Sequence, residues 1–165
     1  MKKANGLFLA VVVLIIALMC GLKTDGSNRN GDTWIPYEQQ SLCEEIGSEY
    51  GVCPELLEAI IEHESSGKTY AKNGPCVGLM QVNMDVHQER AERLGVKDPY
   101  DEYSNILMGT DILMELAAKY EDLPTTLMAY NGTQHPAEKV EAGQISNYAQ
   151  GIMDRAEELE RIHGK

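Results

Sequence analysis

A single glutamate stands where a helix would otherwise bury hydrocarbon. The stretch P-E-L-L-E-A-I-I-E-H-E has the spacing of an amphipathic helix, and one face of it would hold Leu57, Ile60, Ile61 and Glu64. A carboxyl group beside apolar side chains keeps its proton to higher pH, because burial disfavours the charged form. A protonated glutamate at neutral pH can act as a general acid. Glu64 is therefore a candidate catalytic acid, and the alternative is a glutamate at a helix end that reaches solvent.

The other glutamates of this helix fall on the opposite side. Glu55, Glu58 and Glu62 share that side in the helical spacing. The pattern predicts a solvated acidic face there.

Three short motifs follow one another along the chain: Glu64-Ser65, Gly78-Leu79-Met80-Gln81 and Ala129-Tyr130-Asn131. In this order and at these separations they resemble the soluble lytic transglycosylase (SLT) domain of the lysozyme-like superfamily, over about residues 37–152. The resemblance implies a mainly α, lysozyme-like (goose-type/SLT) single helical domain with a cleft. It also implies an enzyme that cleaves the glycan strands of peptidoglycan without a cofactor or a metal.

The resemblance further implies catalytic roles for Glu64 and Tyr130, the tyrosine hydroxyl approaching the acid. It implies that the substrate is bound by Ser65, Gly78, Leu79, Met80, Gln81, Asn131 and Tyr148. For each of these residues the alternative is an ordinary packing or turn position. One departure concerns Gly132, which follows Asn131 directly where the family often has Ala-Gly.

In the family a single glutamate first protonates the glycosidic oxygen and then serves as the base, so that the muramyl C6 hydroxyl closes a 1,6-anhydro ring. Two alternatives stay open. A goose-type muramidase would hydrolyse the same bond, with Asp85, Asp98 or Asp101 as a second carboxylate. A non-catalytic glycan-binding module is the second alternative.

The N-terminal region has the pattern of a targeting segment. Lys2 and Lys3 precede an apolar run from Leu7 to Cys20, so we expect residues 1–23 to be a signal peptide or a signal-anchor helix. A lipoprotein signal at Cys20 is a third alternative. A polar linker, 24–36, and the SLT-like domain, 37–162, would then lie outside the cytoplasm, at the cell surface or in a periplasm-like space.

Charge narrows the range of partners. The formal net charge is −12, and all 26 acidic residues follow position 23. So acidic a domain lacks the basic surface that nucleic acid requires. We expect peptidoglycan as the substrate, the membrane as a partner through the N-terminal segment, and envelope-spanning machinery as a further candidate.

Three cysteines lie in the expected domain: Cys43, Cys53 and Cys76. One disulfide, Cys53–Cys76 or Cys43–Cys53, and three thiols are both compatible with an exported chain. Their spacings do not form a zinc pattern.

The elements that must position these groups are helices. Periodicity predicts helices over about 42–50, from Pro54 to Ser65, over 84–94, from a cap at Ser104 to Tyr120, from Pro124 to about Tyr130, and over 145–162. No long strand is predicted. The expected fold is therefore mainly helical.

Overall fold

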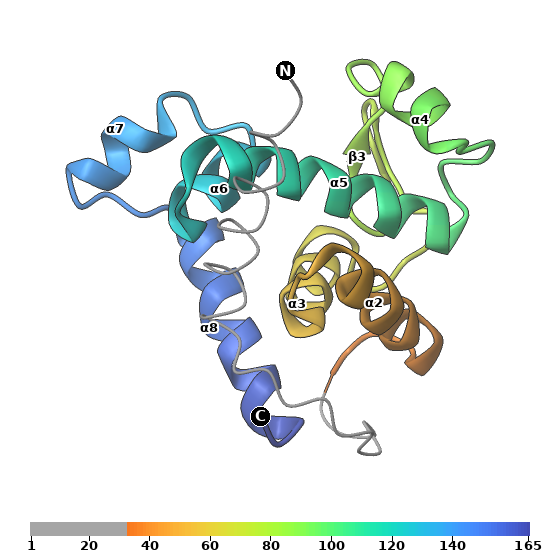
Figure 1. Cartoon of the computed structure of the whole chain (residues 1–165), viewed down its shortest axis with the longest axis horizontal. Helices are drawn as coiled ribbons and strands as arrows, with labels where there is room; N and C mark the ends of the chain where they lie inside the picture. The colour runs from red at the N-terminus through yellow and green to blue at the C-terminus, as the bar shows by residue number, and fades with distance from the viewer. Residues whose placement is uncertain (1–32) are drawn as a thin grey trace, which may run out of the picture.

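The computed structural model describes residues 33–165. The predicted signal peptide or anchor and most of the predicted linker lie outside the described residues. The described part is mainly helical, which confirms the predicted fold class (Figure 1). Its helices are α2 (Tyr37–Tyr50), α3 (Pro54–Ser65), α4 (Gln88–Leu94), α5 (Glu102–Tyr120), α6 (Leu123–Tyr130), α7 (Pro136–Glu141) and α8 (Asn147–Ile162).

A small antiparallel sheet connects α3 to α4. Its strands are β1 (Lys72–Asn73), β2 (Cys76–Val77) and β3 (Val82–Asn83), in the order β1-β2-β3. Val77 pairs with both Lys72 and Val82, so the chain folds back twice within twelve residues. This sheet carries the second motif, residues 78–81, in the turn between β2 and β3.

Helix α3 lies in the middle of the domain, packed between α2 and α8 (Figure 1). Because neighbours cover it on more than one side, its acidic side is buried as well as its apolar side. Glu55 and Glu58 are 0 % exposed and Glu62 is 7 % exposed. The predicted solvated acidic face is therefore wrong.

Partners from distant segments compensate two of these buried charges. Arg155 of α8 binds Glu62 through Nε at 2.7 Å and through Nη2 at 3.1 Å, and the Trp34 backbone N–H donates to the same carboxylate at 2.8 Å. Burial raises the pKa of Glu55, but hydrogen bonds from Cys53, His163 and Lys165 outweigh it and lower the pKa to about 2. Both carboxylates thus connect α3 to segments that are distant from it in the sequence.

Several helix starts differ from the predictions. Helix α2 begins at Tyr37, about five residues earlier than predicted. Asp101, not Ser104, caps α5, because its carboxylate accepts the Ser104 backbone N–H at 2.9 Å. Helix α4 begins four residues later than predicted, and α8 begins at Asn147 behind a Ser146 cap. The short helix α7 is not predicted by periodicity at all.

The three cysteines of residues 33–165 are thiols. Cys53 Sγ donates to Glu55 Oε2 at 3.0 Å and to Glu160 Oε1 at 3.1 Å, so neither predicted disulfide through Cys53 forms. Cys76 is half-buried in β2.

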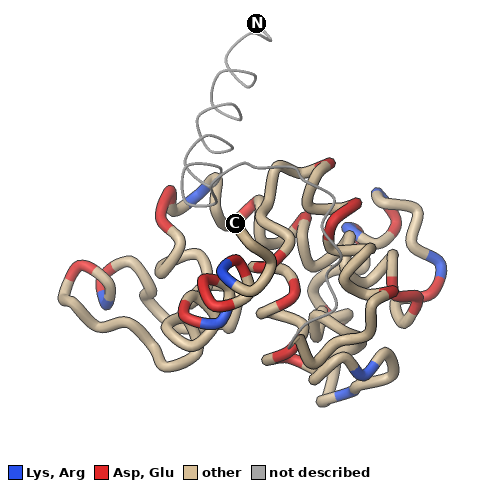
Figure 2. The backbone as a smooth tube through the Cα atoms, turned by 90° about the horizontal axis from the view of Figure 1, so that it is seen from below, with Lys and Arg blue, Asp and Glu red and all other residues tan. Residues whose placement is uncertain are grey.

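Acidic positions are spread over the whole described backbone (Figure 2). Within residues 33–165, no helix combines the length and the apolar character needed to cross a membrane.

Candidate active site

Glu64 lies in the last turn of α3, one residue before its end. The helix stops because Ser66 adopts a left-handed conformation, with φ 54°, and its N–H binds the Glu62 carbonyl. On the predicted face, Leu57, Ile60 and Ile61 are all 0 % exposed. The Glu64 side chain closes this face and is only half-buried. Its carboxyl group therefore lies where the apolar core meets solvent.

The surroundings favour the neutral form of this carboxyl group. Burial raises the pKa of Glu64, while the hydrogen bond from Tyr148 and the charge of His63 partly oppose the rise. The net direction is upward, which is the direction a general acid needs at neutral pH.

Tyr148 is the direct partner of Glu64. Its hydroxyl donates to Glu64 Oε1 at 2.6 Å, from the first turn of α8. The tyrosine side chain is 8 % exposed, and the His63 ring contacts it edge-on with ring centroids 4.7 Å apart. Burial and the Glu64 charge both raise the pKa of Tyr148, so its hydroxyl stays a donor. The packing of α8 on α3 thus fixes the orientation of Glu64 through a residue that lies 84 positions away in the sequence.

Tyr130 occupies a neighbouring position but has another hydrogen-bond partner. Its hydroxyl donates to the Met80 carbonyl at 2.9 Å and so links the end of α6 to the second motif. Burial raises the pKa of Tyr130, and the charges of Glu64 and Cys76 add to the rise. The tyrosine thus lies near enough to Glu64 to be affected by its charge, while its hydrogen bond goes to backbone.

The glycine of the second motif is required by a buried asparagine. Gly78 has φ +78°, and a Cβ there would lie 2.2 Å from Asn105 Nδ2. Asn105 is 0 % exposed and accepts the Met80 N–H at 2.8 Å while donating to the carbonyls of Val77 and Pro99. Asn105 therefore fixes the turn that carries residues 78–81. No short motif in the sequence marks Asn105 for this role.

Two residues of the second motif belong to the core. Leu79 and Met80 are 0 % exposed, so neither side chain is available to a sugar. Met80 packs on Gly109 of α5 so closely that a Cβ at Gly109 would lie 2.5 Å from the Met80 sulfur. In this structure the apolar motif residues hold the turn in place and leave recognition to the polar ones.

The other predicted substrate-binding residues are placed as follows. Gln81 is half-buried with φ 48°, and its Nε2 donates to the Gly78 carbonyl at 2.9 Å. Ser65 is 7 % exposed and donates to the Ile61 carbonyl of its own helix, not to the acid. Asn131 is exposed and follows the last residue of α6. Of these three, Asn131 is the most open to a bound molecule.

Asp85 is a further carboxylate near Cys76. Burial raises the pKa of the Cys76 thiol, and the charges of Glu64 and Asp85 raise it further. Cys76 therefore lies within electrostatic range of both carboxylates. Asp85 is exposed, in the segment that follows β3.

A half-buried acid at the end of a central helix, in a mainly helical domain, is consistent with a lysozyme-like fold. Residues 41–151 match the family described as "Transglycosylase SLT domain". The "Transglycosylase" of Enterobacteria phage PRD1 is 35 % identical over 90 residues, which is 54 % of this chain and 33 % of the phage protein. The match thus spans about a third of that relative's length. The chain belongs to the transglycosylase SLT domain family.

Proposed function

We propose that the domain is a peptidoglycan lytic transglycosylase that uses Glu64 as both acid and base. It would cleave the MurNAc-β-1,4-GlcNAc bond without water and leave 1,6-anhydroMurNAc ends. The observation that carries this proposal is the half-buried Glu64 carboxyl, with a raised pKa and one oxygen bound to Tyr148. Membership of the SLT family supports the same reaction class.

The first step uses the proton that burial retains. Glu64 donates it to the glycosidic oxygen, the C1–O bond breaks with its electrons on the leaving oxygen, and positive charge develops at C1 of the muramic acid. In the second step the Glu64 carboxylate removes the proton of the C6 hydroxyl, and O6 forms the new bond to C1. Glu64 ends the cycle protonated, so one carboxyl group completes both proton transfers.

Tyr148 and Tyr130 have different roles in this proposal. The Tyr148 hydroxyl holds Glu64 Oε1 and leaves Oε2 to exchange the proton with the sugar. Tyr130 holds the Met80 carbonyl and through it the turn of residues 78–81. Gln81 and Asn131 are the polar motif residues that we assign to hydroxyl or N-acetyl groups of the strand. The fixed geometry reduces the entropy lost when acid and sugar are aligned.

The second candidate is a muramidase that hydrolyses the same bond. Asp85 favours this muramidase reaction. The exposed Asp85 carboxylate and Glu64 both lie within electrostatic range of Cys76, and Asp85 could activate a water molecule. The two candidates differ in product, since hydrolysis leaves reducing ends and transglycosylation leaves anhydro ends.

Digestion of purified peptidoglycan, followed by mass spectrometry of the fragments, tests the proposal. Wild-type protein and Asp85→Asn should both give anhydro-muropeptides at similar rates. Reducing ends that disappear in Asp85→Asn would establish the muramidase instead. Strands that are bound but left intact by the wild type would establish a glycan-binding module.

The cellular setting is also part of the proposal. Residues 1–23 would direct the chain through the membrane or anchor it there, with the domain outside the cytoplasm acting on peptidoglycan. A net charge of −12 is compatible with binding to neutral glycan strands and disfavours binding to nucleic acid. A role beside envelope-spanning machinery would need local rather than bulk cleavage. Membrane fractionation of the full chain against a chain that begins at position 24 tests the anchoring.

A further inference from the structure

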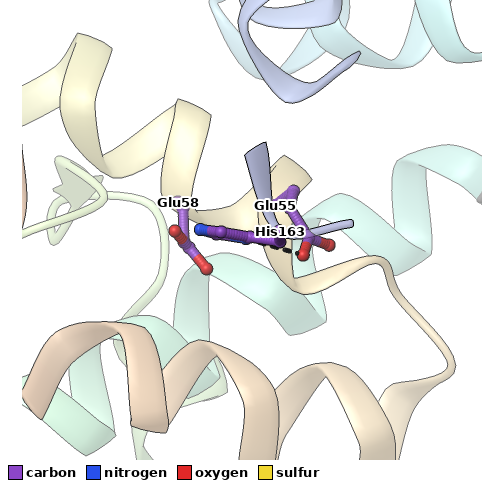
Figure 3. Close-up of side chains that lie close together, drawn as sticks. All are labelled: Glu55, Glu58 and His163. Carbon is purple, nitrogen blue, oxygen red and sulfur yellow. Dashed lines mark hydrogen bonds and ion pairs between the residues drawn. The ribbon is translucent and has the colours of Figure 1, made fainter. Parts of the chain in front are cut away.

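Two clusters of side chains lie outside the candidate active site. The first is buried at the start of α3, where Glu55 Oε1 lies 3.0 Å from His163 Nδ1 (Figure 3) and 2.9 Å from Lys165 Nζ. These contacts connect α3 to the residues after α8. The second cluster is aromatic and exposed, so a ligand can reach it.

The exposed cluster is a tyrosine pair: Tyr70, in the loop between α3 and β1, and Tyr100, in the loop before α5. The two ring centroids lie 5.8 Å apart, and the ring planes make an angle of 37°. Tyr70 is 81 % exposed, the highest value among the large hydrophobic side chains of residues 33–165, while Tyr100 is half-buried. Tyr100 therefore supports the Tyr70 ring, and most of that ring stays open to solvent.

Hydrogen bonds hold the loop that carries Tyr70. The Thr69 hydroxyl donates to Glu102 Oε1 at 2.5 Å. Gln39 Nε2 of α2 donates to the same oxygen at 2.9 Å and to the Gly67 carbonyl at 3.0 Å. The loop is thus connected to α2 and to the first turn of α5, so Tyr70 is displayed on a fixed backbone.

Tyr100 depends on the asparagine that fixes the second motif. Asn105 Nδ2 donates to the Pro99 carbonyl at 2.8 Å, and the same side chain holds the turn of residues 78–81. The Tyr100 backbone N–H donates to Asp98 Oδ1 at 2.9 Å. One buried side chain therefore positions both the loop of Tyr100 and the second motif.

The tyrosine pair lies next to the sheet that carries this motif. Ala71, the residue after Tyr70, accepts the Gly78 backbone N–H at 2.9 Å, and β1 begins one residue later. The loop of Tyr70 also begins directly after α3, whose last turn carries Glu64. A polymer of many sugar rings that binds at Glu64 therefore has the tyrosine pair within its reach.

The chemistry of an exposed tyrosine ring suits a sugar. The face of an aromatic ring is apolar and carries partial negative charge. A pyranose ring presents C–H groups with partial positive charge on its flat faces, so it can stack on the aromatic face. A ring that is held in place before binding also loses less entropy on binding. The tyrosine pair therefore has the properties of a sugar-stacking platform.

We propose that Tyr70, supported by Tyr100, binds a sugar ring of the glycan strand beyond the bond that is cleaved. This inference rests on the proposed function, in which peptidoglycan is the substrate. Tyr70 contacts the sugar, and Tyr100 is a positioning residue that holds the Tyr70 ring. The contact keeps the strand on the domain while Glu64 acts.

The test measures the affinity of the full-length chain, in detergent, for soluble glycan strands whose stem peptides an amidase has removed. Every protein carries Glu64→Gln, so that the strands stay intact. Tyr70→Ala should bind about threefold to tenfold more weakly than this parent. Tyr70→Phe should bind as the parent does, because it keeps the ring. Tyr100→Ala should also weaken binding, and Tyr100→Phe should restore it.

Tyr37→Ala is the matched control, because Tyr37 is 59 % exposed at the start of α2, and it should bind as the parent does. The differences should persist at about 0.5 M salt, where attraction between charges is screened. Tyr70 is 81 % exposed, so its substitution should leave the fold intact. If circular dichroism shows that Tyr100→Ala does not fold, Tyr70→Ala decides.

Two results would overturn the proposal. One is Tyr70→Ala with the affinity of the parent, which would remove the platform and leave the lytic reaction standing, because the wild-type digestion products are measured separately. The other is a parent that binds only strands with stem peptides, since the peptide would then be the ligand.

Discussion

The hydroxyl of Tyr148 donates a 2.6 Å hydrogen bond to Oε1 of Glu64 and joins the first turn of α8 to the last turn of α3. This contact orients a carboxyl group whose pKa burial raises. It also makes the acid depend on the packing of the two helices, because neither residue has the other as a neighbour in sequence.

Replacing the acid should remove activity. Glu64→Gln has nearly the same shape but no exchangeable carboxyl proton, so peptidoglycan cleavage should fall by at least about 100-fold. Glu89→Gln, at an exposed position of α4, is the matched control and should cleave at the wild-type rate. Turbidity clearance of purified cell walls measures both. Clearance by Glu64→Gln at the wild-type rate would show that another residue is the acid.

The same substitution should raise stability at neutral pH. The pKa of Glu64 is higher in the folded chain than its ordinary value, so the folded state binds the proton more tightly than the unfolded state. That contribution is fully present below the ordinary value and is lost as pH rises through the folded pKa. Glu64→Gln stays neutral throughout. In urea unfolding, its free energy relative to wild type should therefore increase between pH 4 and pH 7, and a decrease would contradict the pKa direction.

Tyr148→Phe should change the pH profile of activity. The Tyr148 hydrogen bond lowers the pKa of Glu64, so its removal leaves that pKa still higher. The alkaline limb of the profile should move to higher pH while the maximal rate falls, because the acid is no longer oriented. The measurement is the initial rate of cleavage across the pH range.

Tyr130→Phe should behave differently, because its hydroxyl binds the Met80 carbonyl. The alkaline limb should stay where it is in the wild type, and the free energy of unfolding should fall by about 1–3 kcal/mol. Equal shifts of the limb in both phenylalanine variants would show that the two tyrosines bind Glu64 interchangeably.

Gly78→Ala should be more destabilising than an alanine at another left-handed glycine. Both Gly78 and Gly143 have positive φ, 78° and 74°, so each pays the backbone cost of about 1–2 kcal/mol. Only at Gly78 would the new Cβ collide with Asn105, at 2.2 Å, whereas Gly143 has nothing within 4 Å. Thermal unfolding of Gly78→Ala and Gly143→Ala compares the two. Equal losses would mean that Asn105 moves aside freely.

Arg155→Ala should destabilise the domain by about 2–4 kcal/mol, because it leaves the Glu62 carboxylate buried without its cation. The lower end of this range allows for solvent screening of the ion pair, because the Arg155 side chain is 19 % exposed. Arg161→Ala, at an exposed position in the last turn of the same helix, should have little effect. Urea unfolding of both variants checks the difference.

Much of the fold follows from local sequence. The spacing of Leu57, Ile60 and Ile61 predicts α3, places Glu64 on its apolar face, and agrees with the structure. Pro54 begins the helix as expected, and Gly51 and Gly95 end their helices in the left-handed conformation that glycine adopts at low cost.

What local sequence does not predict depends on distant partners. Glu62 has the spacing of a solvated residue, but Arg155, 93 positions away, stabilises it inside the fold. The turn at Gly78 depends on Asn105, which no short motif identifies. Asp101 and Ser104 are both good capping residues, so only the geometry selects Asp101. Helix α7, with six residues and little apolar periodicity, gives no signal to detect.

In the proposed reaction Glu64 helps to close a ring within the sugar, and no water enters the product. Cleavage of peptidoglycan in water enriched in heavy oxygen, followed by mass spectrometry of the fragments, shows directly whether water takes part. Ring closure by O6 should give muramic acid ends without the heavy isotope. Incorporation of one heavy oxygen per cleaved bond, in a reaction that Glu64→Gln abolishes, would contradict it.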